Sequence, residues 1–227
     1  EINMLFRSLI SSLLFCFTVS AALAQTAAKV YPIKDASEFV SGGNTTIDIV
    51  QSDSEYLRVE ADTEVMDRIK VDQTNQRLSV WVKSGKGGFF DWFVHGKEPV
   101  KIILHVKQLR YLELSGGALA KVGDLNGLEL NMEASGAVKV QFSQLTMERV
   151  NMGVSGAANV GIQSINAKEQ RYGISGASVM EIKEDSFGDR LDVDASGASK
   201  FSGEKLVVKK AALNASGASH INATVTE

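Results

Sequence analysis

Two acidic residues have a spacing that could bring them together for chemistry. Glu113 and Glu133 are twenty residues apart, and each stands two residues before a Ser-Gly pair. If the chain repeats with that period, the carboxylates lie on neighbouring strands, where they could share a cation or act as a paired acid and base. The equivalent positions of the next two units hold Gly153 and Gly173, so the row of acids ends at two. Two carboxylates make a poor calcium cage, and a solvated face explains them more simply.

The histidines and glycines add no second constellation of this kind. His95, His105 and His220 are widely spaced and lack a metal-ligand pattern such as H-E-x-x-H. The sequence contains no G-x-S-x-G nucleophile motif, and the glycines at 42–43 and 85–88 do not match a phosphate-binding loop. The glycine-rich calcium nonapeptide is absent as well. The sequence therefore predicts no catalytic residue, no metal site and no cofactor.

Charge and cysteine content exclude two further classes of protein. The chain has 24 basic and 27 acidic residues, a net charge of −3, and no basic block. Phosphate binding needs clustered Lys and Arg, so a nucleic-acid partner is not expected. The single cysteine, Cys16, lies in an apolar segment near the N-terminus. The remaining chain cannot use disulfides or thiolate metal ligands and must be held together by its core.

A Ser-Gly-Ala motif recurs through the second half of the chain. Glycine accepts backbone angles that are closed to other residues, alanine fits a tight bend, and serine can bond to nearby backbone or to the serine of the next unit. The direction of the serine side chains is left open by the sequence. No base recurs beside them, so the serines are interpreted as structural. The serines are 20, 20, 20, 21 and 20 residues apart, at Ser115, where Gly117 replaces the alanine, and at Ser135, Ser155, Ser175, Ser196 and Ser216.

The residues around each motif alternate as in a half-buried strand. The positions three and one before each serine are apolar, and the position between them is polar or small. The residue five positions after each serine is apolar too. One 20-residue unit cannot bury its own apolar face, so copies must stack about 4.8 Å apart as parallel strands. The sequence therefore predicts an all-β fold, a parallel β-helix with about 20 residues per coil and repeated Ser-Gly-Ala corners.

A leucine-rich repeat has a similar period and is the alternative architecture. Its L-x-x-L-x-L pattern is imitated once, by Leu125, Leu128 and Leu130, and is not repeated in the following units. No unit carries a convincing helix pattern, which further disfavours this alternative. Ahead of the regular repeats, which begin at about residue 110, short strands separated by polar turns are expected at 46–49, 56–59, 69–71, 78–82 and 100–104.

The N-terminus resembles a secretory signal peptide. Arg7 precedes an apolar run from Leu9 to Val19, and Ala22-Leu23-Ala24 supplies small residues for cleavage before Gln25. We expect residues 1–24, including three extra residues before Met4, to be this signal peptide and residues 25–29 to be a mature N-terminal segment. The apolar run is too short for a membrane span, so no transmembrane segment is expected in the mature chain. One continuous β domain would occupy residues 30–227.

One aromatic segment does not follow the strand pattern. Phe89, Phe90, Trp92 and Phe93 lie within five residues, between flexible glycines. Exposed, these rings would offer a stacking surface to sugar rings or to a partner protein, and they are the candidate ligand-binding residues. Tucked down, they would cover an open end or seam of the β-helix. The second interpretation is favoured because a large exposed apolar patch is costly.

The serial Ser-Gly-Ala corners, the signal peptide and the stretch PVKIILHVKQLRYLELSGG resemble the family named putative auto-transporter adhesin, head GIN domain. The likeness covers most of the mature chain, so the 30–227 domain is expected to be head GIN-like. It implies an envelope or secreted protein of Gram-negative bacteria.

Resemblance and residues together predict an exported, non-enzymatic β-helix domain for surface interaction or adhesion. It would be periplasmic, on the cell surface or secreted, with an unknown glycan or envelope protein as its partner. Two alternatives remain, a polysaccharide-active β-helix enzyme and a purely structural envelope module.

Overall fold

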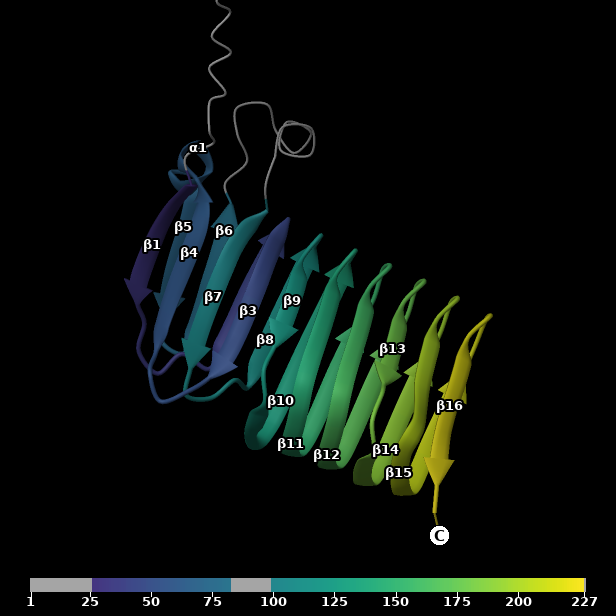
Figure 1. The fold of residues 1–227 in the computed structure, drawn as a ribbon. Coiled ribbons are helices and arrows are strands. Elements are labelled where there is room, and N and C mark those ends of the chain that lie inside the picture. The colour runs from purple at the N-terminus through teal and green to yellow at the C-terminus, as the bar shows by residue number, and fades with distance from the viewer. Residues whose placement is uncertain (1–25, 83–98, 227) are drawn as a thin grey trace, which may run out of the picture.

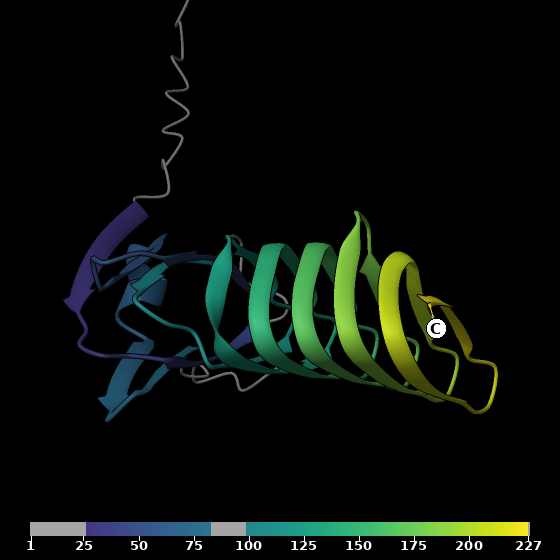
Figure 2. The ribbon, with the colours of Figure 1, turned by 90° about the horizontal axis from the view of Figure 1, so that it is seen from below.

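The computed structural model describes residues 26–82 and 99–226, whose sixteen strands join into one continuous sheet (Figure 1). From β8 onward the sheet winds into parallel coils that follow one another along an axis (Figure 2). The predicted all-β fold, with a parallel β-helix of about 20 residues per coil, is therefore confirmed.

The first part contains β1 (Thr26–Pro32), β2 (Glu38–Gly43), β3 (Thr45–Gln51), β4 (Tyr56–Asp62), α1 (Thr63–Met66), β5 (Ile69–Thr74), β6 (Arg77–Val82) and β7 (Val100–Val106). The coils contain β8 (Tyr111–Gly116), β9 (Leu119–Val122), β10 (Leu125–Gly136), β11 (Lys139–Val154), β12 (Asn159–Ile174), β13 (Val179–Ile182), β14 (Ser186–Ala195), β15 (Lys200–Ala215) and β16 (His220–Val225).

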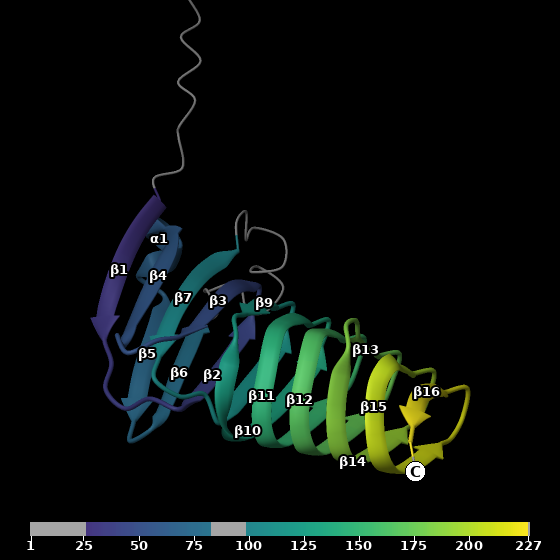
Figure 3. The ribbon, with the colours of Figure 1, turned by 60° about the horizontal axis from the view of Figure 1, so that its bottom comes forward.

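The N-terminal end of the solenoid is built from antiparallel pairs. β1 pairs with β4, β4 pairs with β7, and β5 pairs with β6, all antiparallel. β2 and β3 connect this end of the sheet to the coils, because β2 pairs in parallel with β8 and β3 pairs in parallel with β9 (Figure 3). All five strands predicted ahead of the repeats are present. β1, β2 and α1 were not predicted from the sequence.

The coils enclose a core made of stacked columns of inward side chains. Each residue pairs with the one about twenty positions later, so Met132, Met152 and Tyr172 lie over one another. The apolar columns predicted before and after the serine are buried in the first five repeats, whereas in the sixth Leu213 and Ala215 are exposed and Ile221 is half-buried. A third column, ten positions after the serine, was not predicted. Its buried members include Leu125, Leu145, Ile165 and Leu206.

Leu128 excludes the leucine-rich repeat. Its side chain is 75% exposed, whereas Leu125 and Leu130 are buried. The alternation is therefore that of a strand, and the resemblance to L-x-x-L-x-L is accidental.

Glycine is required at each corner by the backbone and by the coil below. The six corner glycines have φ between 70° and 90°, a region that L side chains rarely adopt. The amide of Ala157 donates to Gly136 O at 2.9 Å, and that of Ala177 donates to Gly156 O at 2.7 Å. The corners therefore stack in direct backbone contact, which leaves no room for a Cβ atom.

The corner serines point outward, while a second set of serines points into the core. The residue before the serine is buried at the first five corners, so strand alternation turns the serine side chain to the surface. Three positions after the corner serine, Ser178 and Ser199 are buried. Ser178 Oγ lies 3.4 Å from Gly156 O, and Ser199 Oγ lies 3.4 Å from Ile174 O. These buried serines, which the sequence did not single out, connect one coil to the preceding one.

The 21-residue spacing has a local structural cause near Ser186. Ile162 pairs with Ile182, but Asn166 pairs with Phe187, so the extra residue lies between these pairs. Ser186 is fully buried in the column otherwise occupied by leucine and isoleucine. Its Oγ accepts a hydrogen bond from the amide of Ile165 at 3.0 Å and donates to Glu184 O at 2.9 Å. The hydroxyl satisfies backbone groups that the insertion would otherwise leave unpaired.

Replacing Ser186 with alanine is expected to lower the free energy of unfolding by about 1 to 3 kcal/mol, because the buried Ile165 amide loses its acceptor. Urea unfolding of Ser186→Ala against Ser202→Ala measures this. Ser202 lies on the outward side of β15, and its loss should cost less than about 0.5 kcal/mol. Equal midpoints for the two variants would contradict the role of the Ser186 hydroxyl.

Candidate functional site

The outward side of one sheet of the solenoid carries the acids singled out in the sequence. This sheet runs through β5, β6, β2, β8, β10, β11, β12, β14 and β15. Its outward residues two and four positions before the corner serines form what we call the polar face. They are Tyr111, Glu113, Asn131, Glu133, Asn151, Gly153, Arg171, Gly173, Asp192, Asp194, Ala212 and Asn214.

Glu113 and Glu133 are neighbours in register, as their spacing indicated, but their partners differ. Glu113 Oε2 accepts hydrogen bonds from Arg77 at 3.0 Å and from the Tyr111 hydroxyl at 3.1 Å. The Glu133 carboxylate instead occupies the space into which a side chain at Gly153 would project. The geometry therefore does not assemble the two acids with a common partner. Burial, followed by the Glu113 hydrogen bond, raises the pKa of Tyr111, which keeps its hydroxyl protonated as a donor.

A hollow of about 510 Å³ lies on the polar face where the row of acids ends. We call it the glycine groove, because Gly153 and Gly173 contribute no side chain to its floor. Its polar walls come from adjacent coils, and its buried lining residues are Met152 and Tyr172. The full lining comprises Asn131, Glu133, Asn151, Met152, Gly153, Arg171, Tyr172, Gly173, Arg190, Asp192, Asp194, Ala212 and Asn214.

The charges in the glycine groove largely pair with one another. Asp192 Oδ2 lies 3.0 Å from Arg190 Nε and 3.5 Å from Arg171 Nε. The other oxygen, Asp192 Oδ1, is shielded from solvent and has no hydrogen-bond partner among the described residues. The hydrogen bond and the ion pair with Asp192 raise the pKa of Arg190, and partial desolvation opposes them only weakly. The groove is thus rich in hydrogen-bonding groups yet has little uncompensated charge.

At both ends of the groove, asparagine side chains form hydrogen bonds between neighbouring coils. Asn151 Nδ2 donates to Asn131 Oδ1 at 2.9 Å, across β10 and β11. Asn214 Nδ2 donates to Asp194 Oδ1 at 2.8 Å, across β14 and β15. These ladders hold the planar groups in place, so a ligand would meet an ordered set of donors and acceptors.

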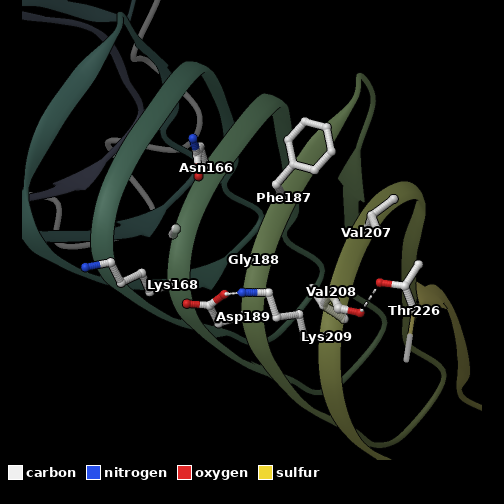
Figure 4. A pocket seen from close by; sticks show the side chains of 10 residues that line it. Asn166, Lys168, Phe187, Gly188, Asp189, Val207, Val208, Lys209 and Thr226 are labelled. Atoms are coloured by element: carbon white, nitrogen blue, oxygen red, sulfur yellow. Dashed lines mark hydrogen bonds and ion pairs between the residues drawn. The ribbon is translucent and has the colours of Figure 1, made fainter.

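A second hollow, of about 360 Å³, is marked by the exposed ring of Phe187 (Figure 4). Phe187 is 56% exposed, and Val207 and Asn166 lie beside it on the neighbouring coils. Along its edge Asp189 Oδ1 accepts from Lys209 Nζ at 2.6 Å, which is the main cause of the lowered pKa of Asp189. Sequence analysis missed Phe187. The available signal was an aromatic residue in a column whose earlier members are Asn126, Thr146 and Asn166.

A third hollow, near the start of the coils, surrounds Glu55. Its side chain is 7% exposed, and its Oε2 lies 3.0 Å from Lys107 Nζ and 3.2 Å from the Asp35 amide. Burial acts to raise the pKa of Glu55, but the bonds from Lys107 and the Asp35 amide together hold it below its ordinary value. A general acid at neutral pH needs a raised pKa, which this carboxyl does not have. Its contacts connect the loop at Asp35 with Lys107.

The histidines contribute no shared site in the described ranges. His105 stacks on Tyr56 with ring centroids 4.3 Å apart, and its Nδ1 lies 3.1 Å from Ser52 Oγ. His220 is exposed on β16. His95 and the predicted ligand-binding residues Phe89, Phe90, Trp92 and Phe93 lie outside the described residues. Residues 26–82 and 99–226 contain no group of three or more His, Cys, Asp or Glu placed to hold a metal ion.

Within the described ranges, no helix has the length and apolar character that crossing a bilayer requires.

Comparisons with solved structures agree on the fold. A putative adhesin from Parabacteroides distasonis is 20% identical, with a TM-score of 0.79 over 88% of this chain and 83% of that chain. A putative adhesin from Parabacteroides merdae is 17% identical, with a TM-score of 0.76 over 87% and 80%. A putative adhesin from Bacteroides fragilis is 15% identical, with a TM-score of 0.64 over 89% and 97%. At these identities the likeness concerns the fold alone.

No curated protein matches the sequence. A family model does match, over residues 37–227, which include every Ser-Gly corner and the strands that lead into them. On that match the chain belongs to the family described as putative auto-transporter adhesin, head GIN domain.

Proposed function

We propose that this protein is an exported, non-enzymatic module for surface interaction, of the adhesin type. The observation that carries the proposal is the polar face, where planar hydrogen-bonding groups surround an open groove on a stacked, closely registered scaffold. Such a face offers binding contacts without a base and a nucleophile placed to act together. The adhesin names of the family and of the similar structures support a surface-interaction role.

The partner is proposed to be a glycan or an envelope protein, and the location periplasmic, cell-surface or secreted. The leader-like residues 1–24 support export. The mildly acidic chain, without a basic block, supports a partner other than nucleic acid.

A polysaccharide-active enzyme is the alternative that the stacked acids favour. We expect the mature chain, residues 25–227, to bind at least one glycan or envelope protein without cleaving any glycan. Binding would be measured on immobilised glycans and envelope fractions, and cleavage as new reducing ends from acidic and neutral polysaccharides with and without calcium. Turnover that Glu113→Gln or Glu133→Gln abolishes would replace the proposal with the enzyme.

The aromatic segment at 89–93 is a second proposed location for binding. It is tested in the same glycan and envelope-protein binding assays. Trp92→Ala would assign recognition to that segment if binding were lost at an unchanged unfolding temperature. A loss of stability of about 3 to 5 kcal/mol would instead indicate a buried covering ring.

A further inference from the structure

Gly173 is a glycine that neither its backbone nor its neighbours require. It lies within β12, and its φ is outside the left-handed region. Nothing lies within 4 Å of the point where a Cβ would be, whereas at Gly153 that space is taken by Glu133 and at Gly161 by Gln141. A glycine within a strand weakens the strand, and it often marks a place where a ligand approaches the backbone closely. Gly153 and Gly161 thus each have the end of a flexible side chain over them, which Gly173 lacks.

The side chains around Gly173 match the chemistry of hydroxyl groups. Each sugar hydroxyl both donates and accepts a hydrogen bond, so it is satisfied where donors and acceptors stand side by side. Arg171 and Arg190 donate, Asp192 and Asp194 accept, and Asn151 can do both.

The charges of the groove favour a neutral ligand. The lining contains three acids, Glu133, Asp192 and Asp194, against Arg171 and Arg190. Both arginines contact Asp192 through Nε, which offsets part of their positive charge and leaves their other N–H groups as donors. An anionic glycan would meet one more negative charge than positive charge, which opposes its binding.

The groove also differs from the centre of a protein interface. Such centres are rich in exposed aromatic and aliphatic side chains that become buried on binding. The large apolar residues of this groove, Met152 and Tyr172, are already 3% and 2% exposed and belong to the core. The surface available to a ligand comes from polar side chains with their aliphatic stems, from the exposed Ala212 and from the backbone of the two glycines.

We therefore infer that the glycine groove binds a neutral hexopyranose unit of a glycan, with the sugar ring lying against the backbone at Gly173. The volume of about 510 Å³ is within the range of small-ligand sites. This inference rests on the proposed function as a binding module and specifies its ligand class and its site.

The test fills the groove without disturbing the fold. Gly173→Thr places a β-branched side chain where space is free, so its unfolding temperature should equal or exceed that of the wild type. The mature chain is screened against oligosaccharides of glucose, galactose and mannose and against uronic-acid oligosaccharides, and the tightest neutral ligand is titrated by calorimetry. We expect Gly173→Thr to weaken that Kd at least tenfold. The matched control Asn159→Thr, on an outward position of the same strand outside the groove, should leave it unchanged.

Three outcomes overturn the inference. The first is wild-type affinity in Gly173→Thr for the neutral ligand. The second is loss of that affinity in Phe187→Ala but not in Gly173→Thr, which places the site in the other hollow. The third is that only uronic-acid oligosaccharides, or no oligosaccharides, bind. Binding of an envelope protein by a chain that binds no glycan would overturn the inference while leaving the surface-interaction function intact. Failure to bind either class would overturn both.

Discussion

Gly156→Ala is expected to destabilise the protein by about 2 to 4 kcal/mol, while Gly117→Ala changes stability by less than about 1 kcal/mol. Gly156 has φ of +81°, and a Cβ atom there would lie 2.8 Å from Gly136 O and 2.9 Å from Gly136 N. Strain in the backbone and contact with the stacked coil therefore add. Gly117 belongs to an equivalent corner, has no positive φ, and would place its Cβ in open space.

The pair applies one substitution to two corner positions, so differences in helix or strand propensity are kept small. Urea unfolding followed by circular dichroism gives both values. Because stacked repeats unfold with their neighbours, the loss at Gly156 should lower the midpoint of the main transition. If both variants had the wild-type midpoint, direct backbone stacking at the corners would be refuted.

Gln170→Leu is expected to cost about 2 to 4 kcal/mol, although its column contains apolar residues in the neighbouring coils. Gln170 is fully buried, and its Nε2 donates to Phe187 O at 3.1 Å and to Ala167 O at 3.2 Å. Its Oε1 accepts from the Tyr172 hydroxyl at 3.0 Å. Burial raises the pKa of Tyr172, so the hydroxyl remains a donor. Leucine would remove these three buried hydrogen bonds and leave the Tyr172 hydroxyl without its acceptor.

The partner substitution separates the side-chain pair from the backbone bonds. Tyr172→Phe should cost about 1 to 3 kcal/mol, because it leaves Gln170 Oε1 unpaired. The double variant Gln170→Leu/Tyr172→Phe should lose less than the sum of the single variants, since it removes both members of one hydrogen bond. The measurement is a double-mutant cycle in urea. Additive losses would show that the hydroxyl and the amide do not stabilise one another.

The aromatic segment at 89–93, the signal peptide and the limits of the domain remain predictions. The aromatic residues lie outside the described ranges, as do residues 1–24. The binding and stability measurements on Trp92→Ala address the segment. Intact mass of the exported protein, expected to begin at Gln25, addresses the leader.

The sequence by itself determined the coils. Each coil pairs with a segment about twenty residues away, so the register, the inward columns and the need for glycine at the corner all repeat with one period. A repeated local constraint appears in the sequence as a repeated residue. This is why the parallel β-helix, the stacking of Glu113 on Glu133 and the structural role of Gly156 could be predicted.

Only the tertiary structure decided where that repetition breaks. Arg77 reaches Glu113 from β6, outside the regular coils, and gives it a partner that the periodic pattern did not indicate. The glycine groove arises because Gly173 has no side chain above it, whereas Gly153 lies under the Glu133 carboxylate, and both read as the same residue in the sequence. The position of a residue within the repeat predicts whether its side chain faces outward. It does not predict which side chains of other coils lie over it. Surface side chains contact residues from several coils and from the antiparallel N-terminal strands. These contacts join residues far apart in the sequence, so the repeat period does not reveal them.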